Sequence, residues 1–315
     1  MSSGVDYAFI QNGALEQTSG GVTMPAGGRP TVRSRRLGAA LKRHREAAGL
    51  DQAAAAEAIM KSVTKVSRME GGLVSASALE VRTLLDRFEV QDPGERARLE
   101  RWARASNERG WWLDYQETVR PDYADHITLE SDSTNIRSWE PALIPGLLQT
   151  PEYARSVITS GPTFITPERV DQLIEVRQER QRRIEAGGTH FTAIIWEPAV
   201  TALSDDPDIC KGQWLRLLDT GRRQNVTVQL LPASASKIAG MSGPFVAFSF
   251  GVEPNVEAVA VRNVANTSVV EAPADLALYS NVFDQLRSAA MSPQESAGRI
   301  RQLLSDAEQP TKEAP

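Results

Sequence analysis

The sequence predicts two domains: a mainly α domain of five helices, then an α+β domain with a small, mostly antiparallel sheet. The chain of 315 residues is about twice as long as a typical domain. Apolar residues recur at helical spacing over the first third, and strand-like runs appear only after Gly187-Gly188. We expect a disordered arm (1–28), the helical domain (29–90), a linker helix (91–110), the α+β domain (111–306) and a disordered tail (307–315).

Capping residues divide the helical domain into its parts. The first helix is expected over 34–48, and Gly49 follows it where a left-handed glycine often ends a helix. Asp51 and Ser62 are expected to cap the second and third helices, because a side-chain oxygen there accepts a backbone N–H of the first turn. The expected ranges of the remaining helices are 52–59, 63–71, 77–88 and about 92–109.

The second domain is expected to mix helices and strands. A turn at Pro145-Gly146 precedes a helix that begins at Thr150-Pro151. Thr166-Pro167 begins a long polar helix that ends near Glu185. The expected strands are 190–196, 226–231, 245–250 and 256–261, and the expected later helices are 209–223, 275–289 and 294–306.

Charge is distributed unevenly along the chain. Residues 29–90 hold 12 Lys/Arg and 7 Asp/Glu, a net charge of +5 in a chain whose total is −5, so the remainder carries −10. This asymmetry is typical of one domain that is attracted to phosphates, and a solvated basic helix face is the alternative. The basic cluster Arg29, Arg33, Arg35 and Arg36 either extends the arm along DNA or belongs to an untethered tail.

The segment 35–72 resembles the Xre/lambda-repressor superfamily of helix-turn-helix regulators. The matching residues are Arg45, Gly49, Leu50, Asp51, Gln52, Ala56, Ser62, Val66, Ser67, Glu70 and Gly72. Ala55 stands where the family usually has a larger aliphatic residue, and Met60 stands where the turn often has glycine. We therefore expect a slightly different packing of the second helix or a different turn. The resemblance implies a third helix that enters the major groove of DNA.

The resemblance also implies roles for the polar residues around this helix. The expected DNA contacts are Arg43, Gln52, Ser62, Val63, Thr64, Lys65, Ser67 and Arg68. Arg68 is expected to bind a guanine, and Lys65 and Arg43 to bind phosphates, which position the protein without reading sequence. Arg45 and Glu70 match a structural ion pair of the family. One such motif reads only a few base pairs, so we expect a homodimer on double-stranded DNA.

The second domain resembles the C-terminal domain of actinobacterial WhiJ-like, antitoxin-like regulators. The matching segments are 145–150, 153–155, 177–181, 228–232 and 292–296. Such regulators are commonly encoded beside a small protein that modulates their DNA binding, so the resemblance implies such a partner. The alternative is a small-molecule sensor with Trp111, Trp112 and Tyr115 in its pocket wall, although aromatic residues at helical spacing also fit a core.

No residue pattern predicts catalysis, a metal or a cofactor, so we expect a protein that is not an enzyme. His44, His126 and His190 lie far apart, and the single cysteine, Cys210, excludes a cysteine-based metal site. The run Asp205-Asp206-Pro207-Asp208 lacks the glycine and distal glutamate of a calcium loop, so a helix-capping turn is expected there.

Nothing in the sequence indicates export or contact with a membrane. No apolar run reaches the roughly 18–20 residues that cross a bilayer, and the N-terminus has no basic-then-apolar signal pattern. We therefore expect a cytoplasmic, nucleoid-associated transcriptional regulator that reads DNA sequence and is controlled through its second domain.

Overall fold

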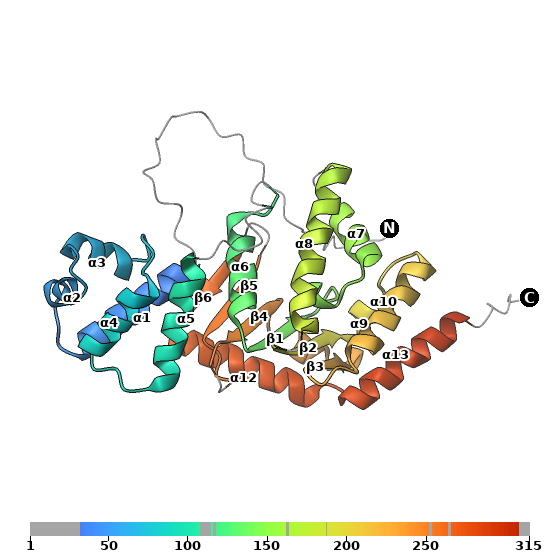
Figure 1. Ribbon diagram of the computed structural model, residues 1–315. Helices are drawn as coiled ribbons and strands as arrows, with labels where there is room; N and C mark the ends of the chain where they lie inside the picture. The colour runs from blue at the N-terminus through green and yellow to red at the C-terminus, as the bar shows by residue number, and fades with distance from the viewer. Residues whose placement is uncertain are drawn as a thin grey trace, which may run out of the picture. The chain divides into compact units, whose positions relative to one another are not determined.

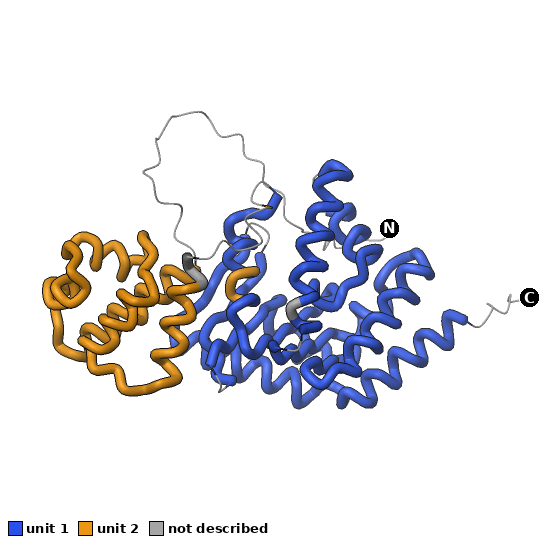
Figure 2. The backbone as a smooth tube through the Cα atoms, viewed as in Figure 1, with its two compact units in different colours: residues 1–14, 117–126, 130–315 blue, residues 15–116, 127–129 orange. Residues whose placement is uncertain are grey.

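The chain forms two units, which are coloured separately in Figure 2. The computed structural model describes residues 32–107, 115, 118–161, 164–186, 188–251, 254–263 and 266–308. The N-terminal unit contains α1 (Val32–Ala47), α2 (Gln52–Ala58), α3 (Val63–Glu70), α4 (Ala78–Arg87) and α5 (Pro93–Asn107). These five helices confirm the predicted mainly α domain.

Side-chain caps set the starts of three of these helices. The Asp51 carboxylate accepts the backbone N–H of Ala54 at 2.8 Å, at the start of α2. Ser62 Oγ accepts the backbone N–H of Lys65 at 3.2 Å, at the start of α3. Ser77 and Glu80 form a reciprocal capping box at the start of α4. The predicted boundaries hold here because each cap satisfies a backbone donor that the helix itself leaves unpaired.

The basic cluster and the linker segment differ from their expected roles. Because α1 begins at Val32, Arg33, Arg35 and Arg36 are helical residues and not part of an arm. Arg33 is buried, and the Arg36 guanidinium lies 5.1 Å from the ring centroid of Trp102 in α5. Arg29 lies outside the described residues. α5, in the segment expected as a linker, packs against α1 and α4.

The turn between α2 and α3 keeps the backbone conformation that glycine would adopt. Met60 has a φ of 52°, in the left-handed region, and its side chain is exposed. This conformation costs a residue with a Cβ about 1–2 kcal/mol. Ala55 is fully buried in α2. The methionine therefore changes the surface of the turn and leaves its left-handed backbone unchanged.

Two glycines allow α1 to approach the end of α3 closely. A Cβ atom on Gly38 would lie 2.3 Å from the backbone oxygen of Met69. Gly72 has a φ of 69°, and a Cβ atom there would lie 2.6 Å from the Cα atom of Arg35. Neither position accepts a larger residue without a shift of the backbone.

The C-terminal unit is built on one six-stranded mixed sheet with the order β3-β2-β1-β4-β5-β6. The strands are β1 (Asn135–Glu140), β2 (His190–Trp196), β3 (Val226–Leu231), β4 (Phe245–Ser249), β5 (Ala258–Arg262) and β6 (Thr267–Val270). β2 pairs in parallel with β1 and β3, and the other three neighbouring pairs are antiparallel. The predicted α+β class is confirmed. The sheet is larger than predicted, because β1 and β6 were not foreseen.

Helices cover both faces of this sheet (Figure 1). On one face, Phe283 and Leu286 of α12 (Pro273–Ala289) form a core with Trp139. On the other face, His126 of α6 (Pro121–Asp132) packs edge-on against Phe248, with ring centroids 5.5 Å apart. The remaining helices are α7 (Pro151–Thr159), α8 (Pro167–Glu185), α9 (Glu197–Thr201), α10 (Pro207–Thr220), α11 (Ser236–Ala239) and α13 (Pro293–Glu308).

A buried ion pair joins α6 to α8. Arg180 Nε donates to Glu130 Oε1 at 2.9 Å, and Arg180 Nη2 donates to Glu130 Oε2 at 2.7 Å. Burial alone would raise the pKa of Glu130, but the charge of Arg180 and hydrogen bonds from His126 and Arg180 lower that pKa to about 2. Glu130 is therefore ionised at neutral pH.

Replacing Gly38 should destabilise the N-terminal unit. Gly38→Ala places a methyl group against the backbone oxygens of Met69 and Glu70, and we expect a loss of about 1–3 kcal/mol in urea unfolding. Gly71→Ala is the matched control, because its Cβ atom would meet Ser67 O at an ordinary 3.4 Å. Equal stability of the two variants would contradict the close approach.

Acid should weaken the C-terminal unit through Glu130. Its pKa in the folded protein lies below the ordinary value of 4.5, so its stabilising effect is complete above that value and is lost as the pH falls towards 2. Glu130→Gln leaves Arg180 buried without its counter-ion and should cost about 3–5 kcal/mol at pH 7. Urea unfolding at pH 7 and near pH 3 measures both effects. Glu179→Gln, which breaks a pair with the exposed Arg182 on the same helix, should cost at most about 1 kcal/mol.

Candidate nucleic-acid interface

α3 has one exposed face and one buried face. The exposed face carries Val63, Thr64, Ser67 and Arg68, and the buried face carries Val66, Met69 and Glu70. At about 100° per residue, the four exposed positions fall within an arc of about 140°. Among the described residues, Arg68 and Thr64 have no side-chain hydrogen bond or ion-pair partner. Their polar groups are therefore available to an external molecule.

A buried ion pair holds α3 in position. Arg45 of α1 donates through Nε to Glu70 Oε1 at 2.6 Å and through Nη2 to Glu70 Oε2 at 3.0 Å. The hydrogen bond with Glu70 raises the pKa of Arg45. Arg45 Nη1 also donates to the backbone oxygen of Leu50 at 2.7 Å, and Gln52 Nε2 donates to Glu70 Oε2 at 2.9 Å. Gln52 thus braces α3 within the unit.

Lys65 and Arg43, the two expected phosphate ligands, each contact a carboxylate of the N-terminal unit. Lys65 Nζ donates to the Glu80 carboxylate. Burial alone would raise the pKa of Glu80, but the Lys65 and Ser77 hydrogen bonds lower it. Arg43 Nη2 lies 3.5 Å from Glu95 Oε1 on α5, about 200° around α1 from Arg45. Each cation therefore has an acidic partner within the unit.

The predicted aromatic pocket wall is only partly described. Trp111 and Trp112 lie outside the described residues, and Tyr115 is half-buried.

The acidic run 205–208 forms the expected capping turn, because the Asp206 carboxylate accepts the backbone N–H of Asp208 at 2.9 Å. Within the described part of the chain, no three His, Cys, Asp or Glu side chains are placed to hold a metal ion. None of the described helices is long and apolar enough to span a membrane.

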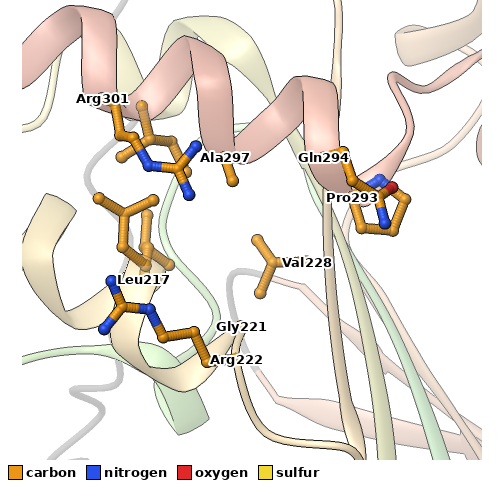
Figure 3. Close-up of a pocket in the computed structure, with 10 residues that line it drawn as sticks. Leu217, Gly221, Arg222, Val228, Pro293, Gln294, Ala297 and Arg301 are labelled. Carbon is orange, nitrogen blue, oxygen red and sulfur yellow. The ribbon is translucent and has the colours of Figure 1, made fainter.

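Cavities in the C-terminal unit were not predicted from the sequence, and two of them have arginines in their walls. One, of about 230 Å³, lies between α10, β3 and α13, and Figure 3 shows Arg222 and Arg301 on its opposite side from Pro293. The other, of about 60 Å³, lies against α6 and α8 and is lined by Arg177, Arg180 and Arg262. Helical spacing places Arg177 and Arg180 on one side of α8, but α8 is so rich in charge that its sequence does not reveal which charges are buried.

Comparisons with known families divide the chain in the same way. The family described as Helix-turn-helix domain matches residues 36–99, which supports an Xre-like DNA-binding regulator. The family described as Domain of unknown function (DUF5753) matches residues 123–302. No curated protein and no solved structure matches the chain. The second match covers more than half of the length of the chain, so the chain belongs to the DUF5753 family.

Proposed function

We propose that this protein is a sequence-specific transcriptional regulator of the Xre type, which binds double-stranded DNA as a homodimer. The observation that carries this proposal is the exposed face of α3, where Arg68 has no partner among the described residues. A guanidinium fork matches the two acceptors, O6 and N7, that guanine presents in the major groove. The Arg45–Glu70 pair supports the proposal because it holds this face on a rigid scaffold.

We assign the C-terminal unit a regulatory role and not a catalytic one. Its resemblance to WhiJ-like, antitoxin-like regulators supports control by a small protein encoded in an adjacent gene. The arginine-lined cavity supports the alternative, which is control by a small molecule. Gel-shift titration on the protein's own promoter region distinguishes the two. Release of DNA by the small protein supports the first, and release by a metabolite extract alone supports the second.

Arg68→Ala should relax sequence specificity at one base pair of each half-site. The loss of a bidentate contact should remove about 1–3 kcal/mol of discrimination there and leave other positions unchanged. Selection of bound sequences from a randomised pool, followed by affinity measurements on single-base variants, gives this profile. Arg87→Ala removes an equal charge from an exposed site on α4 and should preserve the profile. An unchanged profile for Arg68→Ala would exclude Arg68 as a reading residue.

Lys65 and Glu80 should change DNA affinity in opposite directions, and for all sequences alike. Lys65→Ala removes a cation and should weaken binding, whereas Glu80→Gln keeps an acceptor for the Ser77 backbone N–H and releases Lys65 to a phosphate. One phosphate contact corresponds to a change of about 0.9 in the slope of log affinity against log salt. Salt titrations of both variants on specific and random DNA measure the effect. Unchanged slopes in both variants would exclude a phosphate contact by Lys65.

A further inference from the structure

The smaller cavity of the C-terminal unit has a basic polar wall. Its polar lining residues are Tyr123, His126, Gln149, Arg177, Arg180, Arg262 and Thr267, and none of its described lining residues is acidic. Burial, followed by the nearby charge of Arg180, lowers the pKa of His126, so its ring is neutral at neutral pH. The positive charge in the wall therefore comes from the three arginines.

Two of these arginines have carboxylate partners behind the cavity wall. Arg180 is paired with Glu130, as described above. Arg262 Nη2 donates to Glu140 Oε1 at 3.2 Å. Glu140 is buried, and this burial raises its pKa. Three guanidinium groups thus face at most two negative charges.

Arg177 is the arginine of this wall that forms no ion pair with a carboxylate among the described residues. Its Nη1 donates to the neutral side-chain amide oxygen of Gln149. Its Nε atom is buried and has no acceptor among the described residues. A buried charge without a counter-ion is unfavourable, and arginine stays protonated in proteins, so it cannot relieve this cost by losing a proton. An anion in the cavity would supply both the missing charge and the missing acceptor.

The space for such an anion opens beside Gly146. A Cβ atom on Gly146 would lie 3.5 Å from Arg180 Nη1 and 3.8 Å from Arg177 Nε. Gln181 Nε2 donates to the backbone oxygens of Gly146 at 3.0 Å and of Gln149 at 2.8 Å. These bonds hold the segment 146–149 on α8, so binding of an anion would order this segment little further.

The volume of the cavity limits the size of its ligand. About 60 Å³ corresponds to a few water positions at about 10–15 Å³ each, far less than the roughly 300–1,000 Å³ of a pocket for a drug-sized molecule. We propose that the cavity binds a small oxyanion, a carboxylate or phosphate group, on the guanidinium groups of Arg177 and Arg180. Guanidinium forks bind such groups with paired, charge-assisted hydrogen bonds. This site goes beyond the proposed DNA-binding function and is tested without DNA.

Thermal unfolding of the full chain tests the site with inorganic phosphate and, separately, with acetate. Sodium chloride keeps the ionic strength constant. With the anion at about ten times its Kd, the midpoint should rise by a few degrees. Gly146→Ala should abolish the rise, because its methyl group takes the anion's place at ordinary contact distances. Gly212→Ala, whose Cβ atom meets nothing within 4 Å, should keep it.

Two arginine variants separate this cavity from the larger one. Arg177→Gln should lose the response, and Arg301→Gln, in the wall of the larger cavity, should keep it. A response to phosphate alone assigns a phosphoryl ligand, and a response to acetate assigns a carboxylate. The absence of a response to either anion would overturn the proposal. So would a response that survives in Gly146→Ala and Arg177→Gln, or one that is lost in Arg301→Gln.

Discussion

The close contact between α1 and the end of α3 holds the proposed reading surface in place. Gly38 and Gly72 let the two helices come closer than any side chain would allow. At this short separation the Arg45 guanidinium reaches both oxygens of Glu70. The orientation of α3, and with it the direction of Arg68, follows from this contact. A small shift here would move every group on the exposed face together.

Both units use a buried arginine–glutamate pair to hold two helices together, but the surroundings of the pairs differ. Around Arg45 and Glu70, Leu50 and Gln52 supply further hydrogen bonds, so the network is closed. Around Arg180 and Glu130, Arg177 adds a second cation, whose Nη1 donates to the neutral amide oxygen of Gln149. Satisfied networks of this kind stabilise a single conformation, whereas an unsatisfied donor beside a cavity is typical of a binding site.

The basic side chains of α3 differ in whether a carboxylate of the N-terminal unit holds them. Arg68 faces outward without a partner among the described residues, whereas Lys65 is held by Glu80. In the proposed complex, DNA phosphates would compete with this carboxylate for Lys65. In the proposed function, the face of Arg68 reads sequence and Lys65 makes a secondary, salt-dependent contribution.

Features that depend on near neighbours in the chain could be predicted from the sequence. Asp51 and Ser62 cap helices as predicted, because a cap bonds within the first turn. Tertiary structure alone decided the rest. β1 is a central strand despite the polar residues Asn135 and Arg137, because its neighbours β2 and β4 supply its hydrogen bonds. Long-range contacts also decided which basic side chains pair with a carboxylate of the protein and which face solvent. This outcome depends on packing and not on the position of the residue in its helix.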